Sequence, residues 1–220
     1  MRDPHSTGAQ TQWEITPQQA VALQQELRGR VSTVNALAEV RRVAGVDVGF
    51  RGNECIAAVA VLSYPELSLL EVSRAQRPVT FPYIPGLLSF RESPAILQAF
   101  EGVQHSPDLV LVDGQGLAHP RRFGIACHLG LLLDLPTIGC AKSRLCGQAD
   151  PLATETGSSA LLWDGNEVIG AVVRTQANQS PIYVSVGHKI DLPTAIAYTL
   201  SCTGRYRQPE PTRQAHLAAR

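Results

Sequence analysis

Three apolar segments follow one another between residues 43 and 80, and the connections between them are too short to hold a helix. Residues 43–50, 55–64 and 67–80 are rich in Val, Ile and Leu, and Gly52 and Pro65 lie in the turns that separate them. Because parallel strands need a long crossover, these segments are expected to pair as an antiparallel meander. The chain must therefore fold around a sheet whose first three strands are neighbours.

The rest of the chain alternates helical and strand-like patterns. A helix is expected from Thr16, since Pro17 suits the first helical position and Gln19 lies three residues after the cap. Further helices are expected over 87–103, with a kink or break at Pro94, and over 123–135, 193–202 and 211–219. Strands are expected over 108–112, 136–140 and 182–186, with a hairpin formed by 160–163 and 168–174. This order predicts an α/β fold, a mixed sheet with helices on both faces.

Length and composition narrow the class of protein. The 220 residues contain no repeat or linker, so a single domain over 14–220 is expected after a flexible polar segment, residues 1–13. The longest apolar run, residues 55–62, is far shorter than the roughly 20 residues of a membrane helix, and no apolar leader is seen. Five cysteines without a CxxC pair favour reduced thiols and a cytoplasmic location. The formal net charge is zero, so any nucleic-acid site must be a local basic patch.

Three acidic residues stand out against apolar surroundings. Asp47 interrupts the apolar segment 43–50, Asp113 follows the apolar residues 109–112, and Glu92 lies on the helix between them. Each has an ordinary alternative: a hydrogen-bonded structural Asp, a turn residue before glycine, and a solvated helix residue. Together, on strands that can be neighbours, they are the hard oxygen ligands that suit Mg²⁺ or Mn²⁺.

Small and basic residues surround these acids. Gly114 and Gly116 permit close approach to the backbone, and Arg121 and Arg122 follow within the same segment. Lys142 comes after the strand expected over 136–140 and is a candidate for holding a phosphate. Taken alone, each of these cations has the alternative of an exposed surface residue.

Five segments, in this order, resemble the endonuclease V family of deoxyinosine-specific repair nucleases: 43–47, 81–92, 113–122, 139–144 and 209–216. The resemblance spans about residues 14–216 and implies a ribonuclease H-like fold. It implies that Asp47, Glu92 and Asp113 hold the catalytic Mg²⁺, for which Mn²⁺ substitutes. It also implies that His216 assists near the metal and that Lys142 contacts the phosphate backbone. His119 and His188 remain rival histidines at this point.

The same resemblance implies a set of residues that bind DNA and the lesion. Residues 82–85 look like the family's strand-separating wedge, because prolines stiffen the loop and an aromatic ring replaces base stacking worth about 1–3 kcal/mol. A core tyrosine is the alternative for Tyr83. Small residues and backbone amides would form the pocket for a displaced hypoxanthine. The implied DNA- and lesion-binding residues are Pro82, Tyr83, Ile84, Pro85, Gly86, Leu88, Gly114, Gly116, His119, Arg121, Ile125 and Ser143.

The reaction implied by this resemblance is hydrolysis of the second phosphodiester bond 3′ to deoxyinosine, leaving 3′-hydroxyl and 5′-phosphate ends. The expected partner is DNA containing deoxyinosine. The protein is expected to be a monomer and not to bind a membrane. Two alternatives stay open: a nuclease acting on inosine in RNA, and a protein that binds the lesion without cutting. The absence of a GxSxG segment argues against an acyl hydrolase. Cys127 and Cys140 depart from the family's pattern and raise the question of oxidation.

Overall fold

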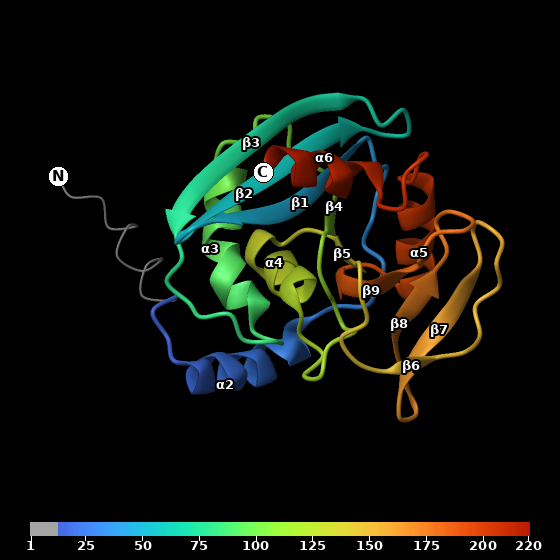
Figure 1. The fold of residues 1–220 in the computed structure, drawn as a ribbon, viewed down its shortest axis with the longest axis horizontal. Coiled ribbons are helices and arrows are strands. Elements are labelled where there is room, and N and C mark those ends of the chain that lie inside the picture. Colours follow the sequence, from blue (N-terminus) through green and yellow to red (C-terminus); the bar gives the residue numbers. More distant parts are fainter. Residues whose placement is uncertain (1–12) are drawn as a thin grey trace.

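The computed structural model describes residues 13–220 of the chain. Its strands are β1 (Arg42–Arg51), β2 (Glu54–Ser63), β3 (Leu69–Pro78), β4 (Leu109–Val112), β5 (Thr137–Ala141), β6 (Gln148–Ala149), β7 (Ser159–Asp164), β8 (Glu167–Val173) and β9 (Ile182–His188). Over the described range they form one mixed sheet in the order β3-β2-β1-β4-β5-β9-β8-β7-β6 (Figure 1). The expected α/β fold with a mixed sheet is therefore confirmed.

The first three strands form the expected antiparallel meander. β1 pairs with β2 along its whole length, from Arg42 opposite Ser63 to Arg51 opposite Glu54. On its other side β1 runs parallel to β4, but only as far as the pair Val46–Val112. The strand β1 thus continues beyond the end of its parallel neighbour, which leaves the carboxyl end of β4 open to side chains from other elements.

The helices begin and end close to the expected residues. They are α2 (Pro17–Leu27), extended by a short 3₁₀ turn at Arg28–Arg30, α3 (Leu88–Glu101), α4 (Ile125–Leu133), α5 (Leu192–Ser201) and α6 (Glu210–Ala218). At the start of α2, Thr16 Oγ1 accepts from the Gln19 backbone at 3.2 Å, and Gln19 Oε1 accepts from the Thr16 backbone at 2.8 Å. This reciprocal pair is the capping box that the sequence predicts.

The helix α3 continues through Pro94, so of the predicted kink or break the break was wrong. A proline inside a helix removes one backbone hydrogen bond. The residues that follow it, Ala95 and Ile96, are buried in the core formed by α3 and the sheet, and this packing holds the helix together.

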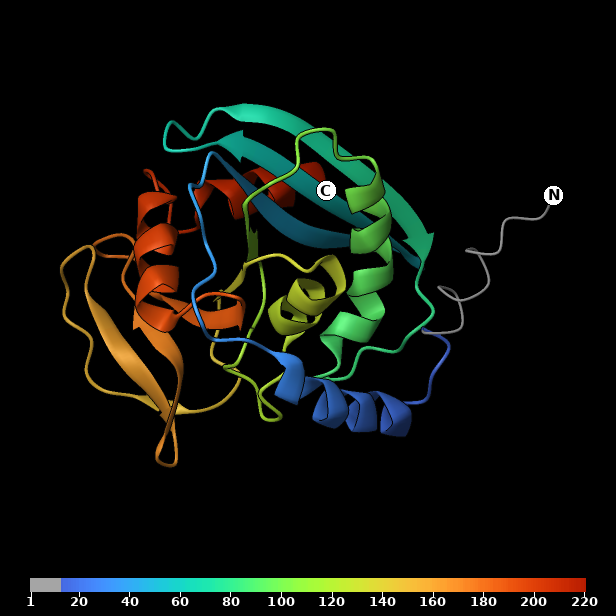
Figure 2. The same ribbon diagram turned by 180° about the vertical axis from the view of Figure 1, so that it is seen from behind.

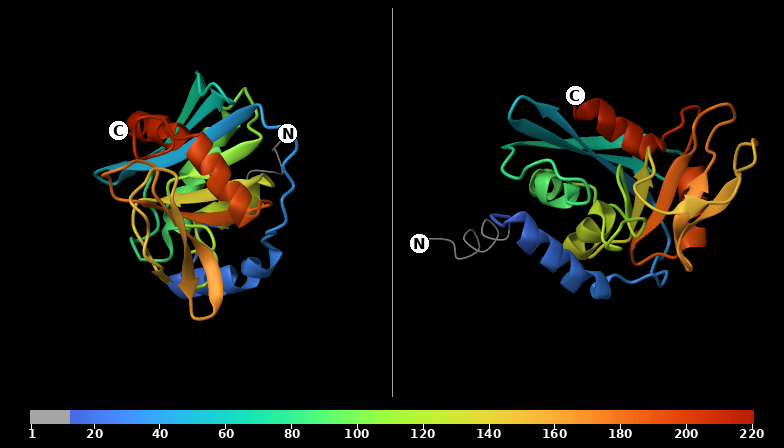
Figure 3. Two further views of the ribbon diagram at one scale, coloured as in Figure 1. Left: turned by 90° about the vertical axis from the view of Figure 1, so that its right-hand side faces the viewer. Right: turned by 60° about the horizontal axis from the view of Figure 1, so that its bottom comes forward.

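Helices cover both faces of the sheet. Alternate residues of β1 and β4 face opposite sides: Ala44 and Val110 pack with α3 and α4, whereas Val43 and Leu109 share a core with residues of α5 and α6. Figure 3 shows the sheet with α6 on one side and α3 and α4 on the other. Figure 2 shows α2 lying beneath α3 and α4, away from the sheet.

The structure describes only the last residue of the amino-terminal segment that was expected to be flexible. The segment expected to be flexible, residues 1–13, lies outside the described residues except for Trp13, whose ring centroid lies 6.3 Å from Phe90 and 5.5 Å from His128. No helix within residues 13–220 combines the length and the apolar character that a membrane crossing requires. The short strand β6 was not predicted, since two exposed residues leave no periodic pattern to read.

Candidate active site

Two of the predicted acids lie next to each other because of the strand register. The parallel pairing of β1 and β4 ends at Val46 and Val112, so Asp47 and Asp113 are the next residues on adjacent strands. The Asp113 backbone N–H still donates to the Val46 carbonyl at 3.1 Å, which fixes the spacing of the two chains. Alternation along β1 directs Asp47 to the face that α6 covers, where His216 Nδ1 donates to Asp47 Oδ2 at 2.6 Å.

The third acid, Glu92, approaches from the helix α3. Its side chain is only 8% exposed, so the alternative of a solvated helix residue was wrong. Burial, together with repulsion from Asp47 and Asp113, raises the pKa of Glu92 to about 8. Burial and the charge of Asp47 also raise the pKa of Asp113, although Lys142 acts in the opposite direction. Asp47 therefore lies close enough to Glu92 and to Asp113 to oppose the ionisation of both.

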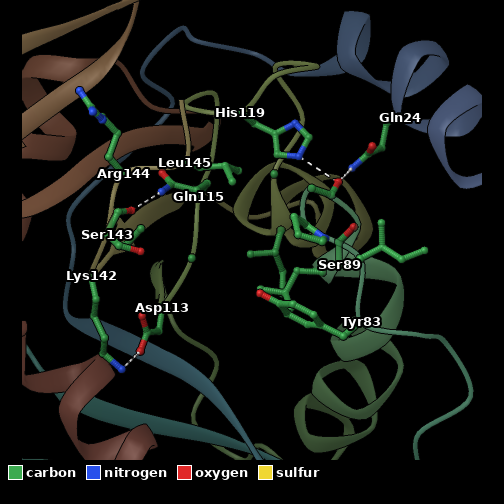
Figure 4. A pocket seen from close by; sticks show the side chains of 18 residues that line it. Gln24, Tyr83, Ser89, Asp113, Gln115, His119, Lys142, Ser143, Arg144 and Leu145 are labelled. Carbon is green, nitrogen blue, oxygen red and sulfur yellow. Dashed lines mark hydrogen bonds and ion pairs between the residues drawn. The ribbon is translucent and has the colours of Figure 1, made fainter. Parts of the chain in front are cut away.

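Cations and amides already contact the two strand acids. Lys142 Nζ lies 2.5 Å from Asp113 Oδ2 (Figure 4), and Gln208 Nε2 donates to the same oxygen at 3.4 Å. Within the described range, no group of three or more His, Cys, Asp or Glu side chains is arranged to hold an ion as it stands. The pairs with Lys142 and His216 keep the carboxylates of Asp113 and Asp47 turned to separate partners.

The donor set nevertheless fits a divalent cation. The pKa values of Glu92 and Asp113 are raised, so it costs free energy to ionise these groups beside Asp47. A divalent cation between the three carboxylates would remove that cost. The Glu92 carboxylate takes part in none of the hydrogen bonds and ion pairs between residues 13 and 220, so its burial is otherwise uncompensated. Oxygen ligands of this kind suit Mg²⁺ or Mn²⁺ better than softer metals.

A pocket of about 330 Å³ opens beside Asp113 and Lys142 (Figure 4). Ten of the residues predicted to contact DNA, the lesion or phosphate line it: Tyr83, Ile84, Pro85, Gly86, Leu88, Gly114, His119, Ile125, Lys142 and Ser143. They come from a loop before α3, from the end of β4, from the start of α4 and from the segment after β5. Residues far apart in the sequence thus form one concave surface of a size that accepts a flat heterocycle.

The loop before α3 is held by one carbonyl. Gly86 O accepts from Gln24 Nε2 at 3.0 Å, from His119 Nε2 at 2.9 Å and from Arg121 Nη2 at 2.8 Å. His119 Nδ1 accepts from the Arg121 backbone, which places the ring hydrogen on Nε2, and burial lowers the pKa of His119 to about 4. His119 is therefore a neutral donor at pH 7.

Glycine is required at position 86. Its φ is +81°, and a Cβ atom there would lie 2.8 Å from Arg121 Nη2. Arg121, predicted to contact DNA or the lesion, uses its guanidinium inside the protein, where it also donates to Gln24 Oε1 at 2.6 Å. This arrangement fixes the loop on the wall of the pocket.

Tyr83 lies at the mouth of the pocket and is 71% exposed, so the alternative of a core tyrosine was wrong. Figure 4 shows its ring beside the opening. The flanking residues Pro82 and Pro85 restrict the backbone on both sides. An exposed aromatic ring on a stiff loop can stack on a base that loses its neighbours.

Two predicted residues are placed differently from the expectation. Gly116 packs against β9 rather than lining the pocket, because a Cβ there would come within 2.0 Å of the Val186 carbonyl oxygen. His188 accepts from the Ser32 backbone at 3.1 Å, and its partner in β5 is Thr137, at the amino end of that strand. The acids lie at the carboxyl end of the neighbouring strand, so this placement favours His216 over His188 as the histidine of the site.

Sequence reasoning missed four polar residues of the pocket, Gln24, Ser89, Gln115 and Arg144. Gln24 is 1% exposed and reaches the loop from α2, while Ser89 Oγ and Gln115 Oε1 are buried without a hydrogen-bond partner among residues 13–220. Gln115 stands between two glycines that the sequence does single out, so its position was a usable signal. Gln24 lies 62 residues from its partner Gly86, and nothing local in the sequence marks it.

The cysteines near the site are buried rather than reactive. Cys127 and Cys140, the two departures from the family's pattern, lie in the core, and burial raises the pKa of both thiols to about 12. Since the thiolate is the form that is oxidised, neither is a ready target.

The fold and the site together define a class of protein. A mixed sheet, two carboxylates on adjacent strands, a third on a covering helix and a lysine beside them are the arrangement of a metal-dependent phosphodiester hydrolase with a ribonuclease H-like fold.

Comparison with known proteins defines the family within that class. The model of the endonuclease V family matches residues 25–217. Endonuclease V of Nostoc punctiforme is 54% identical over 210 residues, which cover 94% of this chain and 95% of that protein. The chain belongs to the endonuclease V family and is a nuclease.

Solved structures of the family have the same fold. The crystal structure of endonuclease V from Streptomyces avermitilis has a TM-score of 0.90 at 42% identity, covering 95% of this chain and 93% of that one. Ciona intestinalis endonuclease V, in complex with a 24mer DNA containing an inosine followed by a ribo-adenosine, has a TM-score of 0.80 at 27% identity, covering 93% and 97%.

Proposed function

We propose that this protein is a DNA repair endonuclease that recognises deoxyinosine and hydrolyses the second phosphodiester bond 3′ to it, leaving 3′-hydroxyl and 5′-phosphate ends. The observation that carries the proposal is that the pocket and the carboxylates share two residues. Asp113 is one of the three acids, Lys142 is paired with it, and both line the pocket. A nucleotide whose base enters the pocket therefore brings its own backbone to the carboxylates. The DNA bound by the Ciona relative supports the choice of substrate.

The pocket supplies the groups that a displaced hypoxanthine requires. The edge of hypoxanthine presents an N1–H donor and an O6 acceptor, whereas adenine has no hydrogen on N1. Gln115 Oε1 can accept such a hydrogen, and the Ser89 hydroxyl can donate or accept, since both atoms lack a partner among the described residues. Tyr83 fills the gap that the base leaves in the duplex, which lowers the cost of extruding it.

The carboxylates supply the catalytic end of the site. Asp47, Glu92 and Asp113 would hold Mg²⁺, for which Mn²⁺ substitutes, and the bound ion would promote attack by water and stabilise charge on the departing oxygen. Lys142 is placed to donate to a non-bridging phosphate oxygen once it leaves Asp113. His216 donates through Nδ1 to Asp47 and so orients that carboxylate.

The displaced position of the cut agrees with the separation of the two parts. We call the pocket beside Asp113 the base pocket, since it is proposed to hold the displaced base. Asp47 and His216 lie outside the base pocket, and Lys142 borders both the base pocket and the hollow beside Asp47 and His216. A base held in the pocket therefore has its own nucleotide beside Asp113 and a later phosphate beside Asp47. This separation supports cutting beyond the lesion rather than at it.

A duplex with one deoxyinosine, labelled on the strand that carries it, tests this function. We expect nicking that requires Mg²⁺ or Mn²⁺, at the second bond 3′ to the inosine, and none on a matched duplex with adenine. Specific binding without nicking in either metal would establish a lesion-binding protein instead. A parallel RNA substrate decides between DNA and RNA as the preferred substrate.

We also infer a cytoplasmic monomer. All five cysteines are free thiols, four of them buried, which supports a reducing compartment. The single-chain site supports a monomer, because the acids, the lysine and the pocket all come from one copy of the chain.

A further inference from the structure

A second hollow, of about 270 Å³, adjoins the acids on the side of Lys142 away from the base pocket. It is bordered by Asp47, Phe50, Arg51, Lys142, His216 and Arg220. We name it the α6 groove, because it lies between the end of β1 and the end of α6. Figure 1 shows the end of α6 lying over β1 and β2.

The floor of the α6 groove depends on one glycine. A Cβ atom at Gly49 would lie 2.1 Å from the Ala219 carbonyl oxygen, so only glycine lets the end of α6 sit directly on β1. This close approach brings Arg220 to His216, where Arg220 Nη2 donates to His216 Nε2 at 3.0 Å. The two walls of the groove are therefore fixed relative to the acids.

The charge of the α6 groove is mostly positive. Arg51, Lys142 and Arg220 line the groove together with one carboxylate, Asp47; Lys142 is already paired with Asp113, so the two arginines supply the surplus positive charge. Neither Arg51 nor Arg220 takes part in an ion pair with any residue that the structure describes, so both guanidinium groups keep their charge available. Phosphate oxygens are the ligands that such planar donors bind most readily.

Among residues 13–220, the cations of the α6 groove are not accompanied by an aromatic ring. Phe50 borders the groove, but alternation along β1 directs its ring to the face opposite Asp47, where Arg91 of α3 covers it at 4.6 Å from its centroid. In sites for single strands of nucleic acid, cations along a groove follow the backbone. The α6 groove has this part of such a site, and it continues directly from the carboxylates.

We propose that the α6 groove binds the nucleic-acid strand on the 3′ side of the cleaved bond, with phosphates on Arg51 and Arg220. This inference rests on the proposed function, which orders the strand from the base pocket, past the acids, toward its 3′ end. The base pocket lies on one side of Lys142 and the α6 groove on the other. A strand with its lesion in the pocket and its scissile phosphate at the acids therefore enters this groove.

Substrates of two lengths test the proposal. One inosine duplex ends at the nucleotide after the cleaved bond, and the other continues for about ten nucleotides, enough to fill a single-strand site. Binding is measured by fluorescence anisotropy in metal-free buffer, so that no cutting occurs, across a series of salt concentrations. The variants are the double substitution R51Q/R220Q and, to restore charge, R51K/R220K.

We expect R51Q/R220Q to bind the long duplex about tenfold more weakly, and the slope of log affinity against log salt to fall by about 1.5. On the short duplex it should match the unaltered protein, and R51K/R220K should recover most of the binding to the long one. Arg41→Gln is the matched control, because it removes a positive charge from the opposite end of β1. Thermal melting of each variant shows whether it is folded.

An equal loss on both lengths, or no loss on either, would overturn the α6 groove as the site of the 3′ strand. A loss confined to duplexes extended on the 5′ side would overturn it too. Failure of the proposed function has a different signature: the unaltered protein would then bind inosine and adenine duplexes equally at both lengths. The two ideas can therefore fail separately.

Discussion

Asp113 is the residue on which the two halves of the site meet. It follows β4 directly, lines the pocket shown in Figure 4, and accepts from both Lys142 and Gln208 on one oxygen. Its pKa is raised by burial and by Asp47, which indicates that the surroundings accept its charge only with a cation nearby. A residue of this kind contributes more to chemistry than to stability.

Replacing Asp113 by asparagine keeps its shape and removes its charge. We expect Asp113→Asn to lower metal-dependent nicking of an inosine duplex by at least about a hundredfold, since one of the three proposed metal ligands would be lost. Binding of the duplex should change by less than about threefold, because the pocket wall is preserved. Single-turnover nicking and anisotropy measure the two effects.

Asp134→Asn is the control for that experiment, because Asp134 is an exposed carboxylate paired with Lys189 outside the site. It should leave nicking unchanged. Full cutting by Asp113→Asn would refute the assignment of Asp113 as a ligand.

At the scale of elements, the loop before α3 owes its shape to a helix far away in the sequence. Gln24 of α2 donates to the carbonyls of Gly86 and Phe123 and accepts from Arg121. One buried amide thus ties α2, the pocket loop and the approach to α4 together. The stability of the helix and the geometry of the pocket are consequently linked.

Gln24→Leu breaks that tie and leaves the Phe123 carbonyl and a guanidinium hydrogen of Arg121 unpaired, while the Gly86 carbonyl keeps its bonds from His119 and Arg121. We expect the free energy of unfolding to fall by about 2–4 kcal/mol and inosine binding to weaken at the same time. Urea denaturation and anisotropy provide the measurements. Gln25→Leu, an exposed neighbour on the same helix, should change stability by less than about 0.5 kcal/mol. Equal effects of the two substitutions would contradict the role of Gln24.

Elements with local signals were predictable from the sequence. The capping box at Thr16, the meander over β1 to β3 and the hairpin of β7 and β8 all rest on residues close together in the chain. The acids were also marked, because a carboxylate in an apolar strand such as Asp47 is conspicuous on its own. The roles implied for His216 and Tyr83 came from the family's motifs, since neither residue is distinctive by itself.

What could not be predicted depends on contacts between distant segments. The placement of Gly116 against β9, the reach of Gln24 to Gly86 and the packing that carries α3 through Pro94 are examples. No periodicity or spacing encodes such contacts; they follow from the assembled sheet.

At the scale of the whole molecule, α3, α4 and the segment that precedes α2 meet around a buried histidine. The ring of His128 lies among Trp13, Phe90 and Phe123, with centroids between 5.2 and 5.5 Å apart. Both of its nitrogens lack a hydrogen-bond partner among the described residues, and burial lowers its pKa to about 4. The folded protein therefore keeps this histidine neutral.

That burial makes stability depend on pH. An unfolded histidine with an ordinary pKa near 6.5 binds a proton more readily than His128 does in the fold, so acid favours unfolding between about pH 6.5 and pH 4. From pH 7 to pH 5 the loss due to His128 is about 2 kcal/mol. His128→Leu should therefore lose about that much less than the unaltered protein over the same interval, in urea titrations at the two pH values. Parallel losses would show that His128 does not cause the dependence.

Lys142, with its side chain bordering both hollows, limits how the enzyme could be redesigned or could diverge. Under the proposed function, a substitution there would alter the choice of base and the hold on the backbone together, so neither property could be adjusted through this position alone. Changes in the range of damaged bases accepted should instead arise at pocket residues that do not border the α6 groove, such as Ser89 or Leu145. Libraries built at those two positions can vary selectivity while the machinery that cuts the strand is left intact.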